Sequence, residues 1–204
     1  REQLPLGSVP ILVKDNIETI EWPTTAGSLA LTDNLTGRDA DLISRLRESG
    51  AVILGKANLS EWANFRSEKS ISGWSGVRGQ TPNAFDVTRS PCGSSSGSAV
   101  SVALGYVPVA IGSETDGSIV CPASLNGVVG FKPTHGLVSG VGIVPIAATQ
   151  DTAGPIATSV IDAAITLGAM IDVDGNSTET STPIRDKLLA LKAPADLKGK
   201  RIGI

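Results

Sequence analysis

The sequence is poor in aromatic residues and has a single histidine, and both shortages exclude kinds of site. Aromatic residues make up 3% of the 204 positions, which argues against an aromatic-lined binding groove. With one histidine, His135, and two cysteines, no set of zinc ligands is apparent. We therefore expect neither a metal ion nor another cofactor.

Cysteine is scarce as well. Cys92 and Cys121 are too few to form a disulfide scaffold. We predict that both are free thiols, which favours a reducing compartment such as the cytoplasm.

Positive charge is in deficit, because 17 Lys and Arg stand against 20 Asp and Glu and the net charge is −3. This balance excludes a nucleic-acid-binding protein that works through a basic patch. No apolar stretch approaches the ~20 residues of a membrane-spanning helix, so no membrane span is expected. The first residues, REQLPLGSVP, fit neither a signal peptide nor a transit peptide.

The sequence does contain an alternation of strand-like and helix-like segments, which is typical of an α/β fold. Segment 39–50 predicts a helix with Asp39 as its N-cap and Gly50 just beyond its end. Ser159, with Asp162 three residues later, predicts the start of a helix at 159–171. We expect further helices at 58–66, 96–106 and 184–192, strands at 8–19, 51–55, 107–114, 128–134 and 197–204, and a long loop at 67–91.

Residues 93–124 hold eight serines interleaved with glycines, which raises the question of what this run does. A flexible linker explains it poorly, because the run contains the strand-like VPVAIG. A phosphate-binding loop would need GK[ST] or GxGxxG, and neither is present. Residues 93–97 match the G-x-S-x-G of a nucleophile elbow, but a polar segment precedes them in place of a strand. That reading, like a cysteine hydrolase, would also depend on His135, which we expect to be an exposed turn residue.

A serine hydrolase can instead use a neutral lysine as its base. Lys14 follows an apolar strand, where lowering a lysine pKa from ~10.4 to ~7 requires about 4.6 kcal/mol of desolvation. Asp15 would keep the ammonium charged if it paired with Lys14, but adjacent side chains on a strand point to opposite faces. From the pattern alone, Lys56 remains a rival base.

Three segments together resemble the amidase signature family: PILVKDNI (10–17), SPCGSSSGSAV (90–100) and GSETDGSIVCPASLNGVVGFKPT (112–134). The forms NLSEWANFRS, CGSSSGS and ETDGSIVCPA are similar to the peptide amidase branch. The resemblance implies a mixed, twisted β-sheet flanked by helices. It also implies an amidohydrolase that cleaves the C–N bond of a peptide amide or a small carboxamide.

The resemblance also implies a catalytic triad. Lys14 takes the position of the base, and Ser118 takes that of the nucleophile that forms an acyl-enzyme. Ser94 takes the position of the serine that relays the proton between them, and its peptide bond to Gly93 is cis in the family. Ser95 takes the position of a serine that supports the relay by hydrogen bonding.

The oxyanion hole implied by the resemblance consists of the backbone N–H groups of Thr115, Asp116, Gly117 and Ser118. The commonest family form of this turn is GGSxR. In this chain Asp116 replaces a glycine and Val120 replaces the arginine. Both changes look typical of the peptide amidase branch.

Two further groups of residues match the family without a catalytic role. Gln150, Asp151 and Thr152 correspond to a QDT segment, which we expect to be scaffold near the site. Trp62, with Phe65 and Arg66 nearby, could line the substrate pocket, but we expect Trp62 to pack in the core.

Members of the family are commonly more than twice this long, which implies a partial, central segment of a longer enzyme. We assign 1–171 to the amidase signature core, 172–183 to a linker and 184–204 to the truncated start of a C-terminal half. The remainder of the enzyme chain is expected to be required for activity. Two alternatives stay open: a glutaminase-type amidotransferase of which this chain is the catalytic component among partner proteins, and a truncated, inactive module that keeps only the fold.

Overall fold

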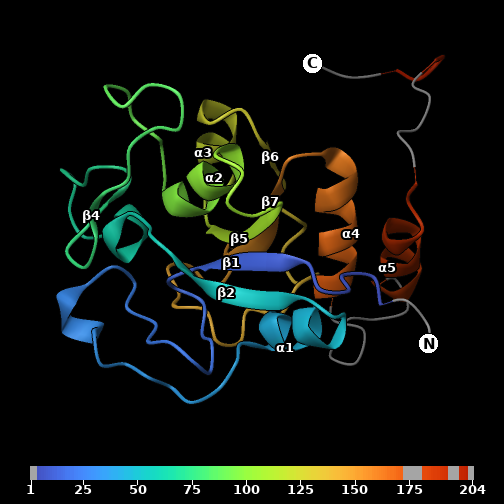
Figure 1. The fold of residues 1–204 in the computed structure, drawn as a ribbon, viewed down its shortest axis with the longest axis horizontal. Helices are drawn as coiled ribbons and strands as arrows, with labels where there is room; N and C mark the ends of the chain where they lie inside the picture. Colours follow the sequence, from blue (N-terminus) through green and yellow to red (C-terminus); the bar gives the residue numbers. More distant parts are fainter. Residues whose placement is uncertain (1–3, 172–180, 193–197, 202–204) are drawn as a thin grey trace.

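The computed structural model describes residues 4–171, 181–192 and 198–201. At its centre lies a five-stranded sheet with the strand order β2-β1-β5-β7-β6 (Figure 1). β1 is parallel to both β2 and β5, whereas β7 is antiparallel to β5 and β6. This confirms the predicted mixed sheet. The strands are β1 (Pro10–Lys14), β2 (Val52–Ala57), β5 (Val109–Glu114), β6 (Val129–Gly130) and β7 (Thr152–Ala157).

Helices cover both faces of the sheet (Figure 1). Helices α1 (Asp41–Glu48) and α4 (Val160–Met170) lie on one face, and α2 (Ser96–Ala103) and α3 (Val120–Leu125) lie on the other. Consecutive residues of β5 serve the two layers, because side chains of a strand alternate between faces. Ile111 packs in the core with α1 and α4, and Ala110 packs with α2 and α3. Helix α5 (Ser181–Leu189) contacts α4.

The ends of two predicted helices test the capping signals. Ser159 accepts a hydrogen bond from Asp162 N–H at the start of α4, which confirms the predicted cap. Gly50 follows α1 with φ +93°, a conformation that favours glycine, which also confirms the prediction. The prediction of Asp39 as an N-cap was wrong. Its carboxylate instead accepts Ile20 N–H and forms an ion pair with Arg47.

Residues 58–91 are less regular than the sequence predicts. The predicted helix at 58–66 is limited to a 3₁₀ segment, η2 (Glu61–Asn64), in which Trp62 and Ala63 have φ near +50°. These positive φ values are incompatible with an α-helix, so that prediction was wrong. The loop at 67–91 is present, and within it β3 (Trp74–Ser75) pairs with β4 (Gly79–Gln80). A second 3₁₀ segment, η1, covers Leu29–Leu31.

The sequence did not predict α3 or β7. Near the end of the chain, residues 181–183 of the predicted linker form the first turn of α5, and residues 172–180 lie outside the described residues. Of the predicted strand at 197–204, residues 198–201 form no strand and the others lie outside the described residues. Among the residues that the structure covers, no helix is long and apolar enough to cross a membrane.

Candidate active site

Lys14 is the last residue of β1, and its side chain is completely buried. Its ammonium nitrogen lies 2.7 Å from Ser94 Oγ, 2.9 Å from the Ser113 carbonyl oxygen and 3.0 Å from Ser113 Oγ. Asn16 Nδ2 donates to the same Ser113 hydroxyl over 2.8 Å. The nitrogen of Lys14 is therefore fixed by three oxygen atoms, one of which belongs to the predicted relay serine.

Ser94 lies in the segment that leads into α2. The peptide bond between Gly93 and Ser94 is cis, as the family resemblance implies, and the Ser94 side chain is fully buried. The Ser94 carbonyl accepts a hydrogen bond from Ser60 N–H, which ties this segment to the end of β2 and the turn that follows it.

Ser95 links the relay serine to the nucleophile position. Its hydroxyl donates to the Ser113 carbonyl over 3.1 Å and accepts Ser113 N–H over 3.2 Å. Its backbone N–H donates to the Ser118 carbonyl over 3.0 Å. The start of α2, the end of β5 and the Ser118 turn are therefore connected at one residue.

Ser118 occupies the turn between β5 and α3. Its exposed fraction is 8%, whereas Ser94 and Ser95 are 0% exposed. Of these three serines, Ser118 is the one that a substrate can reach. This agrees with the nucleophile position that the resemblance assigns to it.

The carboxylate of Glu114 organises the Ser118 turn. Glu114 is buried, and its two oxygens accept the N–H groups of Gly117 (2.8 Å), Ile119 (2.7 Å) and Val120 (2.9 Å). Gly117 has φ +77°, the left-handed conformation that explains a glycine at this position. Because the N–H of Gly117 is directed at Glu114, the prediction of Gly117 as an oxyanion donor needs correction.

Thr115 is held on two sides. Its hydroxyl donates to the Asp151 carboxylate, whose other oxygen accepts Ile146 N–H and Ala147 N–H. Its carbonyl accepts a hydrogen bond from the Lys132 ammonium over 2.5 Å. Asp151 thus has the scaffold contacts that we expected of the QDT segment, and the next residue, Thr152, begins β7.

The electrostatic state of Lys14 follows from its burial. Desolvation lowers the pKa of Lys14 from 10.5 to about 7, although the negative charges of Glu114 and Asp151 act in the opposite direction. No carboxylate of the described residues lies within ion-pair distance of Lys14. An amine with a pKa near 7 is substantially neutral at physiological pH, so its lone pair can accept a proton.

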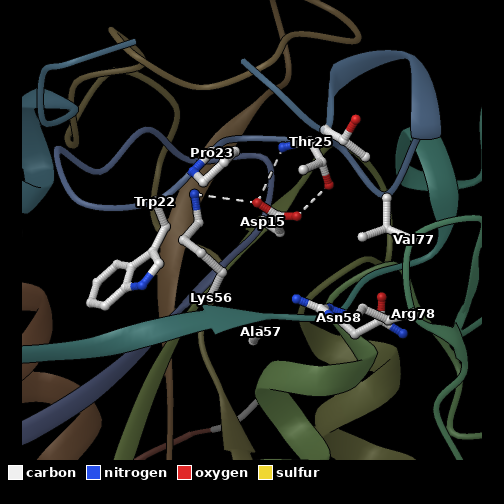
Figure 2. Close-up of a pocket in the computed structure, with 10 residues that line it drawn as sticks. Asp15, Trp22, Pro23, Thr25, Lys56, Ala57, Asn58, Val77 and Arg78 are labelled. Carbon is white, nitrogen blue, oxygen red and sulfur yellow. Dashed lines mark hydrogen bonds and ion pairs between the residues drawn. The ribbon is translucent and has the colours of Figure 1, made fainter. Parts of the chain in front are cut away.

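The rival lysine, Lys56, lies in a separate polar cluster. Figure 2 shows Lys56 and Asp15 pointing toward each other in a cavity of about 480 Å³. Lys56 Nζ lies 3.3 Å from Asp15 Oδ1 and also donates to the carbonyl of Ile17 and the hydroxyl of Thr24. The Asp15 carboxylate accepts both the N–H and the hydroxyl of Thr25. Asp15 therefore pairs with Lys56 and not with Lys14, as expected for adjacent residues of a strand.

The two cysteines correct a prediction. Cys92 and Cys121 form a disulfide in the structure, so they are not the free thiols that the sequence suggested. The bridge joins the residue before Gly93 to a residue of α3, three positions after Ser118. Because local spacing does not reveal spatial proximity, their low number was a poor guide. The weak argument for a reducing compartment no longer holds.

Other predicted residues lie away from the Lys14 cluster. His135 is exposed in a turn, as expected. Trp62 is 36% exposed, so it is not a core residue, and Phe65 is 71% exposed. Arg66 pairs with Glu61 and stacks over the Trp74 ring. In the described part of the chain, no group of three or more His, Cys, Asp or Glu residues is arranged to hold a metal ion.

Sequence reasoning missed four residues of the cluster: Asn16, Ser113, Glu114 and Lys132. Each lies inside or beside a segment that resembles the family, so the motifs contained the signal. Glu114 gave a further signal, because a carboxylate at the end of an apolar strand must find donors when it is buried.

Comparison with known proteins places the chain in a family. Residues 1–204 match the family model described as Amidase. The chain is 48% identical over 204 residues to a "probable amidase" of Arabidopsis thaliana, with 98% of this chain and 40% of the plant protein covered. It is 46% identical over 207 residues to a "putative amidase" of Schizosaccharomyces pombe, with 98% of this chain and 36% of the yeast protein covered. Relatives that are 42–46% identical include the GatA-type component of the glutamyl-tRNA(Gln) amidotransferase, for example that of Deinococcus deserti at 43% over 204 residues, with 100% and 40% covered.

Among solved structures, native peptide amidase from Stenotrophomonas maltophilia matches with a TM-score of 0.82 and 54% sequence identity. That match covers 95% of this chain and 38% of the peptide amidase chain. The chain thus spans about 40% of the length of these curated relatives. Because the family model matches from the first residue to the last and the fold agrees, the chain belongs to the amidase signature family.

Proposed function

We propose that this chain carries the catalytic residues of an amidohydrolase that cleaves the C–N bond of carboxamides. Ser118 is the nucleophile, Ser94 relays the proton and Lys14 is the base. The similarity to peptide amidase supports a C-terminally amidated peptide, or a small carboxamide, as the substrate.

One observation carries the proposal: a buried lysine with a pKa of about 7 lies 2.7 Å from Ser94 Oγ. A neutral amine has two N–H donors and one lone pair. The Ser113 carbonyl can only accept, and the Ser113 hydroxyl already takes one donor from Asn16. If the two N–H groups of Lys14 donate to these oxygens, its lone pair is left for the Ser94 hydroxyl.

The chemical steps follow from this arrangement. Ser118 Oγ attacks the amide carbonyl while its proton moves to Ser94 Oγ and the Ser94 proton moves to Lys14 Nζ. The carbonyl oxygen becomes an oxyanion that backbone N–H groups of the turn stabilise. Collapse of the tetrahedral intermediate breaks the C–N bond, and the relay returns a proton to the departing ammonia or amine. Water then hydrolyses the acyl ester through the same relay.

The test uses a panel of carboxamides and a fluorophosphonate, which reacts with activated serines. Ser118→Ala is expected to abolish ammonia release and labelling, because it removes the attacking oxygen. His135→Ala is the matched control and should retain full activity, since His135 lies in an exposed turn. Labelling that persists on Ser95 in the Ser118→Ala variant would contradict the assignment of the nucleophile.

A glutaminase-type amidotransferase component is a second candidate, supported by the 43% identity to such a protein of Deinococcus deserti. The two candidates differ in the amide that reacts. An amidotransferase component would release ammonia from free glutamine in preference to amidated peptides, and its partner proteins would stimulate it. We expect the reverse preference, because the ETDGSIVCPA form is similar to the peptide amidase branch.

A further inference from the structure

The turn that carries the nucleophile, residues 115–118, is fixed by three side chains from outside it. Glu114 accepts Gly117 N–H, and Asp151 accepts the Thr115 hydroxyl. Lys132 donates to the Thr115 carbonyl over 2.5 Å. The first two contacts satisfy groups that are not needed for oxyanion binding. The third acts on the peptide unit that contains Asp116 N–H.

Lys132 is well placed to hold this carbonyl. It lies two residues after β6, which pairs with β7, and the intervening residue, Phe131, donates its N–H to the Pro155 carbonyl. The following residue, Pro133, is buried. The backbone beneath the side chain is therefore anchored to the sheet. Within the described ranges no carboxylate lies within ion-pair distance of the Lys132 ammonium, so the carbonyl is its recorded partner.

A peptide unit transmits the position of its carbonyl to its N–H. The six atoms from one Cα to the next lie in a plane, and in a trans peptide the C=O and the N–H point in opposite directions. A donor that fixes the Thr115 carbonyl therefore fixes the direction of Asp116 N–H. An ammonium is also a charged donor, and such a hydrogen bond polarises the amide it contacts. The N–H on the other side becomes a stronger donor.

The N–H groups of Asp116 and Ser118 are available. In the part of the chain that the structure describes, neither donates to a protein acceptor, unlike Gly117, Ile119 and Val120. These two groups lie on the turn that presents Ser118. They are the donors left for the oxygen of a carbonyl that Ser118 attacks.

We propose that Lys132 is a positioning residue of the oxyanion site: it holds and polarises the Thr115–Asp116 peptide so that Asp116 N–H stabilises the oxyanion. This inference rests on the proposed function. Lys132 itself touches neither the substrate nor the proton relay. Its removal should weaken binding of the transition state and leave binding of the ground state nearly unchanged.

The experiment compares Lys132→Met with the wild type in the full-length protein, with the best amide of the panel as the substrate. We expect kcat to fall about 10- to 100-fold, part of the 10²–10³-fold loss that follows removal of an oxyanion donor, and KM to stay within about threefold. Two inhibitors provide an independent readout. The aldehyde analogue of the substrate forms a tetrahedral adduct with the nucleophile, whereas the matching alcohol cannot. The Ki of the aldehyde should rise by about the same factor as kcat falls, and that of the alcohol should not change.

Two further variants make the test specific. Lys132→Arg keeps a charged donor and should recover much of the lost kcat. Lys69→Met removes an exposed lysine of the loop at 67–91 and should behave as the wild type. The pH at which activity reaches half of its maximum should be the same in Lys132→Met as in the wild type, because the base is untouched.

An unchanged kcat in Lys132→Met would overturn the inference. So would equal losses of aldehyde and alcohol binding, or failure of Lys132→Arg to restore activity while the variant unfolds at a lower temperature. Failure of the proposed function would look different. In that case the wild type itself would show neither amide hydrolysis nor labelling of Ser118.

Discussion

At the scale of single residues, the choice between two lysines decides the chemistry. Both Lys14 and Lys56 are largely buried, and desolvation lowers the pKa of each. Lys56 donates to a carbonyl, a hydroxyl and the Asp15 carboxylate, so it stabilises the fold as a charged group. Lys14 contacts serine oxygens and no carboxylate, so it can lose its proton. The sequence could place each lysine at the end of a strand but could not say which one faced Ser94.

Amide hydrolysis should depend on the protonation state of Lys14. Because the neutral amine is the base and its pKa is about 7, we expect kcat/KM to rise about tenfold per pH unit below pH 7 and to level off above it. The measurement is the initial rate of ammonia release between pH 5 and pH 9. Lys14→Ala should abolish this activity at neutral pH.

The control for this prediction is Lys56→Ala. It leaves the base in place, so the rising limb should stay near pH 7 even though the variant is less stable with Asp15 unpaired. A limb that moves or disappears in Lys56→Ala, together with substantial activity in Lys14→Ala, would identify Lys56 as the base.

Val120 illustrates how one substitution is accommodated. The commonest family form has an arginine here, whereas in this chain the neighbouring buried carboxylate, Glu114, is satisfied by three backbone N–H groups. Two of these groups belong to residues at the start of α3, where a negative charge is favourable. The turn therefore keeps a fixed shape without a basic side chain at position 120.

At the scale of elements, the sequence predicted those parts whose signals are local. The buried strand before Lys14 and the capped helix after Ser159 are confirmed, because their apolar periodicity and caps lie within the segments themselves. α3 escaped prediction because it is short and contains Pro122. β7, with the sequence TAGPIA, has small residues and a proline, and its burial between β5 and β6 is a property of the assembled sheet.

The candidate site shows the same division. The family motifs predicted Lys14, Ser94 and Ser118, and the structure brings Lys14 and Ser94 into contact and joins Ser118 to them through Ser95. The contacts around them depend on long-range geometry. The bonds from Asn16 to Ser113 and from Lys132 to Thr115 join residues far apart in the sequence, and no local pattern specifies them. The disulfide was mispredicted for the same reason.

The disulfide connects the two segments that carry the serines. Cys92 lies two residues before Ser94, and Cys121 lies in α3, three residues after Ser118. The hydrogen bond from Ser95 N–H to the Ser118 carbonyl joins the same two segments. The covalent link and the hydrogen bond together limit how far the relay and the nucleophile can separate.

Removal of the bridge should therefore affect both stability and activity. The bridge closes a loop with a sequence separation of 29, so we expect the Cys92→Ser/Cys121→Ser variant to lose about 2–4 kcal/mol of the free energy of unfolding. We also expect a lower kcat, because the two serines are held less firmly. Denaturant titration and steady-state kinetics measure the two effects.

Reduction of the wild type by a phosphine, which is oxidised to its oxide as the disulfide becomes two thiols, should have the same consequences. The double variant has no disulfide to reduce, so the phosphine should leave its stability and rate unchanged. If the phosphine affected the double variant as much as the wild type, the effect would not come from this bridge. If neither responded in stability or rate, the bridge would not hold the two segments together.

At the scale of the whole molecule, the surface of residues 1–204 carries many exposed apolar side chains. The chain spans about 40% of the length of its curated relatives, and their additional residues offer a partner for such a surface. Single exposed apolar residues are common in soluble proteins, but extended apolar surface usually marks a contact. Large apolar side chains that are at least 60% exposed are Leu29, Phe65, Ile71, Phe85, Val87, Tyr106, Val141 and Val160.

We therefore expect residues 1–204 expressed alone to differ from the product of the full reading frame. The isolated segment should bind a hydrophobic dye such as anilinonaphthalene sulfonate and should self-associate, because its apolar side chains are uncovered. It should also release little ammonia from amides, since a substrate pocket needs more wall than the Lys14 cluster provides. Dye fluorescence per mole, light scattering and the carboxamide panel measure these properties on both proteins. A monomeric, dye-silent and fully active segment would show that residues 1–204 form a sufficient enzyme. An inactive full-length product would instead favour the fold-only module.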